Sequence, residues 1–329
     1  MRYVIIIIVI ILAAYSWLWF KSQKNYPVEY GISFNQNHAI DLGLNWKEVY
    51  NDMLAELKPK YVRVAAMWSE VEKNKGEYDF ANMDYMLEEA RKNNVKVVLV
   101  VGQKAPRWPE CHVPEWLAEQ NGENARDYLM SYISATVERY KNNSALEFWQ
   151  VENEPFIGFR FGNCKNFKEE YVLAEIDLVR QLDSAHPIIL TDSGELSAWR
   201  RAIKNSDYFG ATLYRVVRKP SGRIFTYDWL PPAFYRYKAK VWGQDLSKMF
   251  ISELQAEPWF ESSRPADTPL EIQEQTMSPD RLKEHFDYVE KIGVPRAYLW
   301  GVEWWYWIKE VRNDSRYWDI VKTRLTSET

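Results

Sequence analysis

Short apolar runs alternate with longer stretches of helical periodicity through most of the chain after residue 28. Runs of roughly four to eight apolar residues that are rich in β-branched side chains are typical of buried parallel strands. The clearest run is Val95–Val101, with the sequence VKVVLVV. The expected strands are Gly31–Asn35, Tyr61–Ala65, Val95–Val101, Leu146–Val151, Pro187–Thr191, Tyr208–Leu213, Met249–Glu253 and Arg296–Trp300.

A stretch with helical spacing of apolar residues follows each expected strand. The expected helices are Trp46–Leu57, Ala81–Asn93, a helix from about Asn121 to Tyr140, Lys168–Asp183, Glu195–Ile203, Pro232–Val241, Pro279–Ile292 and a last helix that ends near Leu325. Strands that alternate with helices predict a parallel sheet. Eight such units in roughly 300 residues are the number that a closed barrel needs. The pattern therefore predicts an α/β fold, a single (β/α)8 TIM barrel.

The first residues have a different pattern. Tyr3–Phe20 contains no charge, and as a helix it spans about 27 Å, close to the roughly 30 Å of a bilayer core. Arg2 precedes this stretch, Lys21 follows it, and Ala14-Tyr15-Ser16 matches a signal-peptidase site poorly. We expect residues 1–24 to be an uncleaved signal anchor, with a cleaved signal peptide as the alternative. Residues 25–329 are then the barrel domain, outside the cytoplasm and either held at the membrane or secreted.

Composition narrows the class of ligand. Hydrophobic residues make up 47% of the 329 residues, and the net charge of −4 comes with both signs well mixed. Because nucleic-acid binding needs a basic face, we expect no nucleic-acid partner. The 16 Trp and 21 Tyr residues serve either a Trp-rich core or flat platforms for sugar rings. We expect a monomer that binds a carbohydrate and also contacts the membrane through its N-terminal segment.

Two expected strands end in a glutamate. The fourth strand is followed by Glu152-Asn153-Glu154-Pro155, and the seventh ends at Glu253. In TIM barrels the active site lies at the C-terminal ends of the strands, so carboxylates from opposite strands can meet across the barrel mouth. Glycoside hydrolysis uses such a pair, one group protonated and the other ionised. We expect Glu154 and Glu253 to be catalytic, with Glu152 and Glu257 as rival carboxylates of lower rank.

These motifs resemble those of glycoside hydrolase clan A, which includes family 5 cellulases and mannanases and family 42 β-galactosidases. Asn153-Glu154-Pro155 after a hydrophobic strand is similar to the acid/base signature of the clan, and Glu253 has the place of its nucleophile. The resemblance implies a retaining β-glycosidase with Glu154 as acid/base. It also implies that Asn153 contacts the sugar 2-hydroxyl and that further residues bind substrate or hold the nucleophile: Arg63, Tyr214, Trp300, Trp68 and Trp259.

Other chemistries lack their motifs. The four histidines, His38, His112, His186 and His285, show neither His-x-His nor His-Glu-x-x-His spacing, so we expect no metal. No phosphate loop, dinucleotide fingerprint or nucleophile elbow occurs, so we expect no cofactor. His38 and His112 fall in loops on the expected active face and are candidates for contact with sugar hydroxyls. His186 and His285 are interpreted as ordinary surface or helix residues.

The two cysteines also fall on the expected active face. Cys111 lies in the loop after the third strand and Cys164 in the loop after the fourth, and these loops are neighbours. In an exported protein such a pair predicts a disulfide, which stabilises by about 4 kcal/mol in the chain-entropy model. Two free thiols are the alternative.

Two other functions fit the same residues. A membrane-anchored carbohydrate-binding protein without catalysis would keep the aromatic cleft and need no acid. A transglycosylase would use the same two carboxylates and lengthen its products.

Overall fold

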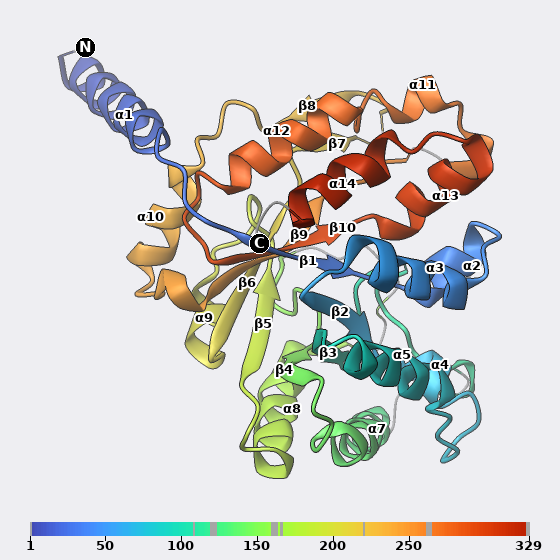
Figure 1. The fold of residues 1–329 in the computed structure, drawn as a ribbon. Coiled ribbons are helices and arrows are strands. Elements are labelled where there is room, and N and C mark those ends of the chain that lie inside the picture. The colour runs from blue at the N-terminus through green and yellow to red at the C-terminus, as the bar shows by residue number, and fades with distance from the viewer. Residues whose placement is uncertain are drawn as a thin grey trace.

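The computed structural model describes residues 2–107, 109–118, 124–158, 164, 167–219, 221–260 and 265–326. Eight parallel strands close into a barrel in the order β1-β10-β9-β6-β5-β4-β3-β2, with the helices outside it (Figure 1). These strands are β1 (Glu29–Ser33), β2 (Tyr61–Ala65), β3 (Lys96–Val101), β4 (Leu146–Val151), β5 (Ile188–Asp192), β6 (Tyr208–Leu213), β9 (Met249–Gln255) and β10 (Arg296–Trp300). The predicted TIM barrel is confirmed, and each predicted strand corresponds to one of its eight strands.

The helices follow the strands and cover the barrel. They are α2 (Gln36–Asp41), α3 (Trp46–Asp52), α4 (Trp68–Val71), α5 (Ala81–Lys92), α6 (Glu115–Ala118), α7 (Ala125–Tyr140), α8 (Glu169–Leu182), α9 (Arg200–Asn205), α10 (Ala233–Val241), α11 (Leu270–Gln273), α12 (Pro279–Val289), α13 (Val302–Arg312) and α14 (Arg316–Thr326). Short helical turns are η1 (Met53–Leu57), η2 (Leu246–Lys248) and η3 (Pro265–Asp267). Residues 119–123, where the helix before Tyr140 was expected to begin, lie outside the described residues.

Four details differ from the sequence prediction. The single helix expected to end near Leu325 is two, α13 and α14, because Asn313 takes a left-handed conformation with φ of 54°. The stretch expected as Trp46–Leu57 is α3 followed by a π-helical turn. The helix expected from Glu195 begins only at Arg200, since Trp199 has a φ of 70° and donates its indole N–H to the carbonyl of Ser193. A hairpin of β7 (Val216–Arg218) and β8 (Ile224–Thr226) was not foreseen.

The barrel interior is filled by side chains below the site. Val98, Phe148, Ile189, Phe250 and Tyr298 form a buried cluster contributed by five different strands. Gly31 makes room for it, because a Cβ at that position would lie 2.8 Å from the ring of Tyr298. Polar side chains replace apolar ones above this cluster, toward the C-terminal ends of the strands, with Arg63 and Gln150 as buried examples. The packed floor therefore ends where the polar site begins.

The N-terminal helix α1 (Arg2–Lys21) projects away from the barrel (Figure 1). It is long and apolar enough to cross a membrane, with a mean hydropathy of 2.5, and it is not buried in the protein. Its last turns touch the barrel domain beside α10, where Trp17 packs on Tyr237 and Tyr15 donates a hydrogen bond to the carbonyl of Trp229. Signal sequences have the same length and composition, so the division at residue 24 stays a prediction.

Candidate active site

A cavity of about 1270 Å³ opens at the C-terminal ends of the strands. This exceeds the roughly 300–1,000 Å³ of ordinary small-molecule pockets, so it has room for more than one sugar ring. Six of the predicted site residues line it: Asn153, Glu154, Tyr214, Glu253, Trp259 and Trp300. The structure therefore brings together residues that are spread over nearly 150 positions of the sequence.

Glu253 lies near the end of β9 and is held from two sides. Arg63, from β2, donates from Nη1 to Oε1 of Glu253 at 3.0 Å. The hydroxyl of Tyr214 donates to Oε2 at 2.8 Å. Both partners favour the charged form of a carboxylate, Arg63 by its charge and Tyr214 by its hydrogen bond.

Glu154 lies just after β4 in a different environment. Burial, and after it the charges of Glu253 and Glu110, raise the pKa of Glu154 well above its usual value. Among the described residues, its carboxyl accepts one hydrogen bond, from the hydroxyl of Thr212 to Oε1 at 3.0 Å. Its backbone N–H donates to Oγ1 of Thr191 at 2.9 Å. Burial and the two negative charges favour the protonated form of this carboxyl, and the hydrogen bond from Thr212 opposes them only in part.

The backbone turns sharply where β4 ends. Glu152 and Glu154 both have positive φ angles, 60° and 45°. Residues other than glycine hold this conformation only where their surroundings enforce it, and such strain is common at functional sites. The turn directs Asn153 and Glu154 into the cavity, while Oδ1 of Asn153 accepts from Nη2 of Arg63 at 2.9 Å.

Glu152 is buried away from the cavity. Its carboxylate accepts the backbone N–H groups of Gln103 and Lys104 at 2.7 and 2.5 Å. It lies beside the buried carboxyl of Glu175, whose pKa is raised well above its usual value by burial and then by the charge of Glu152. Glu152 therefore supports the loop after β3, and among the two carboxyls after β4 only Glu154 lines the cavity.

Trp300, at the end of β10, lines the cavity and is 8% exposed. Its indole N–H donates to Oε1 of Glu257 at 2.8 Å. The guanidinium of Arg107 lies 4.3 Å from the centre of its ring. Arg107 in turn forms a double hydrogen bond with Glu257. Glu257, expected as a rival carboxylate in a loop, thus belongs to the cavity wall beside Trp300.

The two other predicted tryptophans differ from each other. Trp259 lines the cavity and meets the ring of Tyr214 edge to face, with centroids 5.7 Å apart. Trp68 is 1% exposed, stacks on Tyr132 of α7, and donates its indole N–H to Glu72 at 2.6 Å. The expectation that Trp68 binds substrate is corrected: it packs in the outer layer because its only polar atom is satisfied there.

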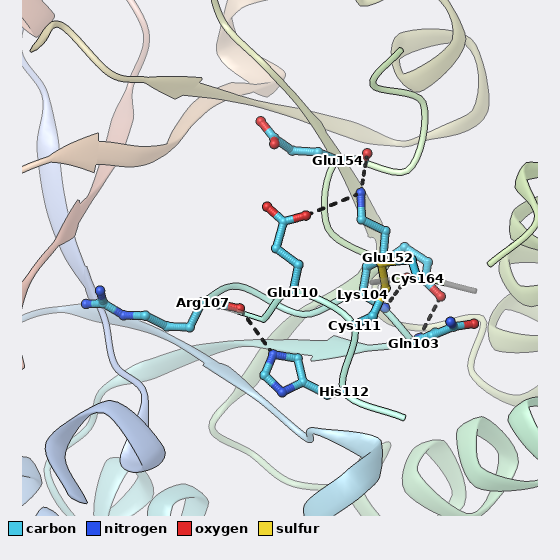
Figure 2. The surroundings of a disulfide bond; sticks show 9 residues. All are labelled: Gln103, Lys104, Arg107, Glu110, Cys111, His112, Glu152, Glu154 and Cys164. Atoms are coloured by element: carbon cyan, nitrogen blue, oxygen red, sulfur yellow. Dashed lines mark hydrogen bonds and ion pairs between the residues drawn. A yellow bond between two sulfur atoms is a disulfide. The ribbon is translucent and has the colours of Figure 1, made fainter. Parts of the chain in front are cut away.

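A disulfide joins Cys111 to Cys164, with Cα atoms 5.4 Å apart. It ties the loop after β3 to the loop after β4. Figure 2 shows Glu110 and Lys104 extending from this loop toward Glu154. Nζ of Lys104 donates to the carbonyl of Glu154 at 3.0 Å and lies 3.9 Å from Oε2 of Glu110. The loop that the disulfide holds therefore contacts Glu154 directly.

Of the four histidines, His38 and His112 line the cavity. His112 contacts the carbonyl of Arg107 at 3.2 Å through its ring (Figure 2). His285 is on α12 as expected but is buried, and its ring contacts the carbonyl of Gln255 at 2.7 Å. His186 pairs with Asp183 at 2.7 Å.

One group of side chains has the spacing of a metal site. Ligand atoms of His38, Glu257 and Glu303 lie within 4.8 Å of one another. Arg107 already bonds both carboxylates, and its distance to Glu303 is 2.9 Å. A metal ion would have to displace this buried guanidinium, so the group does not fit a metal.

Sequence reasoning missed several residues of the site. Thr191 and Thr212 look like ordinary strand residues, and only their alternation with apolar neighbours signals that they face inward. Arg107 and Glu110 lie in a loop with no periodic pattern. For Arg107 the sequence offered one signal. It is a cationic residue shortly after the end of a strand, and TIM barrels have their active sites at that end of the strands.

Comparisons with known proteins relate this chain to glycosidases. The family model of glycoside hydrolase family 42, described as β-galactosidase, matches residues 43–186. This segment includes Arg63, Asn153 and Glu154 and ends before Glu253. The β-galactosidase BgaA of Clostridium cellulovorans is 25% identical in an alignment 175 residues long that covers 45% of this chain and 25% of that protein. Mannan endo-1,4-β-mannosidase A of Hypocrea jecorina is 24% identical in an alignment 173 residues long that covers 48% of this chain and 38% of that protein.

Solved structures share the fold. A GH5_18 protein from Streptomyces cattleya, solved in complex with GlcNAc, aligns with a TM-score of 0.60 at 12% identity, over 84% of this chain and 71% of that one. Xylanase 10B from Thermotoga petrophila aligns with a TM-score of 0.54 at 16% identity, over 86% of this chain and 84% of that one. The sequence matches span well under half the length of the two curated relatives. Together with the family-model match they confirm the resemblance to glycoside hydrolase clan A.

Proposed function

With kinship to the clan A glycoside hydrolases as the premise, we propose that this protein hydrolyses β-glycosidic bonds of an oligo- or polysaccharide with retention of anomeric configuration. The proposal assigns Glu253 as nucleophile and Glu154 as acid/base. It rests on one observation above the others: two carboxyls line the same cavity in opposite environments. Glu253 is held by a cation and a hydroxyl donor, whereas burial and nearby negative charge raise the pKa of Glu154.

The first step requires a protonated Glu154 and an ionised Glu253 at the same time. Glu154, protonated, donates its proton to the glycosidic oxygen as the bond to the anomeric carbon breaks. Glu253, ionised, attacks that carbon and forms a glycosyl-enzyme ester. In the second step Glu154, now a carboxylate, takes a proton from water, and the water displaces Glu253. Configuration is retained because the carbon is inverted twice.

The neighbours of the pair support these roles. Arg63 uses one N–H on Glu253 and another on Oδ1 of Asn153, so it sets the two side chains relative to each other. Because Oδ1 of Asn153 already accepts from Arg63, its N–H₂ group is the part that can donate to the 2-hydroxyl of the sugar. Hydrogen bonds to that hydroxyl strengthen in the transition state. Trp300 and Trp259 offer apolar faces to the C–H groups of sugar rings.

The activity is tested on a panel of aryl β-glycosides and soluble β-glycans. We expect release of reducing sugar, with the β-anomer appearing first in the NMR spectrum of the products. The variants Glu154→Gln and Glu253→Gln should lose activity, while Glu138→Gln, on the exposed outer face of α7, should keep it. Release of the α-anomer would contradict retention. Binding of glycans without turnover would favour the carbohydrate-binding alternative, and longer products would favour a transglycosylase.

Retention also requires a particular geometry. We expect the carboxyl groups of Glu154 and Glu253 to lie about 5–5.5 Å apart in a crystal structure with a bound substrate analogue. A separation of roughly 6.5–9.5 Å would leave room for a water between carboxyl and sugar and would indicate inversion.

We also propose that this activity lies outside the cytoplasm, at the membrane or secreted, because α1 is long and apolar enough to be a signal or an anchor. If α1 is an uncleaved anchor, the full-length protein should fractionate with membranes and survive carbonate extraction. A mature N-terminus near Trp17 would show a cleaved signal instead.

A further inference from the structure

A second set of polar side chains lines the cavity beside Trp300, apart from the catalytic pair. His38 comes from α2, Arg107 from the loop after β3, and Glu257 from just after β9. Arg107 bonds both oxygens of Glu257 and also Oε2 of Glu303, a fully buried carboxylate whose other oxygen accepts the backbone N–H of Asn35 at 2.6 Å. Arg107 and Trp300 therefore hold the carboxylate of Glu257 in one orientation, and Glu303 holds Arg107 in turn.

His38 is the incomplete member of this set. Its Nε2 is buried and has no hydrogen-bond partner among the described residues, and it lies 3.8 Å from Oε2 of Glu257, beyond hydrogen-bond length. Burial and the nearby charge of Arg107 lower the pKa of His38 well below its usual value, so the imidazole is neutral at pH 7. A buried polar atom without a partner is costly, so it indicates a position where a ligand atom completes the network.

The position of His38 is set by the backbone. Its N–H donates to Oδ1 of Asn35 at 3.0 Å, the cap of α2. The ring therefore stays beside the cavity without help from Nε2. An oxygen to one side of the line that joins Nε2 of His38 and Oε2 of Glu257, roughly 2.8 Å from each, would bond both if it can accept one hydrogen bond and donate another. A hydroxyl group has that pair of properties.

The set lies on the nucleophile's side of the cavity. Glu257 follows Glu253 by four residues, just past the same strand β9, and Trp300 ends the neighbouring strand β10. Glu154, after β4, instead lies beside Lys104 and Glu110 of the loop after β3. Because the acid must reach the leaving group, the leaving group lies toward Glu154. The sugar that stays on the nucleophile lies toward Trp300 and this set.

We propose that His38 and Glu257 bind one hydroxyl of the glycone between them, at a ring position other than C2, and that this contact determines which sugar the enzyme accepts. Arg107 acts as a positioning residue for Glu257. The inference rests on the proposed glycosidase function and names the substrate class: a neutral glycone with this hydroxyl unsubstituted. Uronic acids are excluded, because the charge of Arg107 is already matched by Glu257 and Glu303.

The test pairs a change in the protein with a change in the sugar. His38→Phe keeps the ring and removes Nε2. His186→Phe is the matched control, since His186 lies outside the cavity lining. Each protein is assayed for kcat/KM on the aryl β-glycoside that the wild type uses best and on its 3-deoxy, 4-deoxy and 6-deoxy forms. The aryl β-uronide is included.

For one deoxy position we expect the wild type and His186→Phe to lose about tenfold to a hundredfold in kcat/KM. His38→Phe should lose a similar factor on the parent sugar and lose little more on that deoxy form, while it discriminates normally at the other positions. Glu257→Gln keeps an oxygen that can accept from the indole N–H of Trp300. It should also reduce the loss of kcat/KM on that same deoxy form. Equal deoxy penalties in the wild type and in His38→Phe, or efficient turnover of the uronide, would overturn the inference.

Failure of the proposed function can be distinguished from failure of the hydroxyl site. If the wild type cleaves none of the parent glycosides, calorimetric binding of the methyl β-glycosides and their deoxy forms decides instead. Weaker binding of one deoxy form by the wild type, with the difference lost in His38→Phe, supports the hydroxyl site without catalysis. No binding to the wild type, or equal binding by both proteins, overturns it.

Discussion

Glu154 and Glu253, the two glutamates that we propose to be catalytic, lie at the same end of one barrel, yet their surroundings are opposite. Glu253 accepts from Arg63 at 3.0 Å and from Tyr214 at 2.8 Å. Glu154 accepts from one neutral hydroxyl, that of Thr212, and faces the negative charges of Glu253 and Glu110. The donors on one side stabilise a carboxylate, and the charges on the other side favour a carboxylic acid.

The difference shows how one chemical group takes two roles. A glutamate cannot be both acid and nucleophile in the same step, so the protein around each must separate their protonation states. Here the separation comes from different neighbours: Arg63 and Tyr214 bond Glu253, whereas Glu154 has one hydroxyl donor, Thr212, and the negative charge of Glu110 nearby. The predictions below challenge this division, beginning with the largest expected effect.

Removal of the nucleophile should have the largest effect. We expect Glu253→Ala to lose about 10⁶-fold in kcat on every substrate, because no glycosyl-enzyme can form. Azide, which fits the vacated space, should restore part of the turnover of activated aryl glycosides and give a glycosyl azide of inverted configuration. NMR of the product checks this. A β-configured azide would point to rescue at the acid position and reverse the two assignments.

Removal of the acid should depend on the leaving group. For Glu154→Ala we expect a loss of about 10²–10⁴-fold in kcat/KM on glycosides with poor leaving groups, the usual contribution of general acid catalysis. Aryl glycosides with acidic phenols need less protonation and should lose much less. A series of phenols of increasing acidity measures the trend. A flat trend would mean that Glu154 is not the acid.

Tyr214→Phe removes one of the two donors to Glu253 and leaves the aromatic ring in place. A hydrogen bond to a charged group contributes about 1.5–3 kcal/mol, so we expect kcat/KM to fall by about 10- to 150-fold. Thermal unfolding should hardly change, since the ring still packs on Trp259. The matched control is Tyr128→Phe, on the outer face of α7. A loss no larger than that of the control would remove Tyr214 from the support of Glu253.

The smallest effect should come from Glu110. Burial raises its pKa to about 7, so it is neutral below that pH and charged above it. Once charged, it raises the pKa of Glu154 and keeps the acid protonated to higher pH. Glu110→Gln removes this repulsion, so the alkaline limb of kcat/KM should move to lower pH by less than about one unit. The acid limb should not move. A shift to higher pH would show that Glu110 does not act on Glu154 by its charge.

Some of the site could be predicted from local pattern. Glu154 follows a hydrophobic strand and Glu253 ends another, so strand periodicity was enough to place both at the barrel mouth. Glu257 shows the limit of this reasoning. It lies past the end of β9, yet its carboxylate forms part of the cavity wall because Trp300 and Arg107 bond it there. Trp68 shows the opposite error, because it was expected at the site and is buried in the outer layer instead. The local sequence after a strand end does not indicate whether a tryptophan side chain points into the cavity or away from it.

The sequence by itself determined the order of strands and helices and which strands deliver carboxylates, because both follow from the spacing of apolar residues along the chain. The tertiary structure decided the environment of each carboxylate. Arg63 and Glu253 are 190 positions apart, and Arg107 and Glu257 are 150 apart. Protonation depends on burial and on charges a few ångströms away, and no periodicity along the chain records which distant residues the closed barrel brings to that distance.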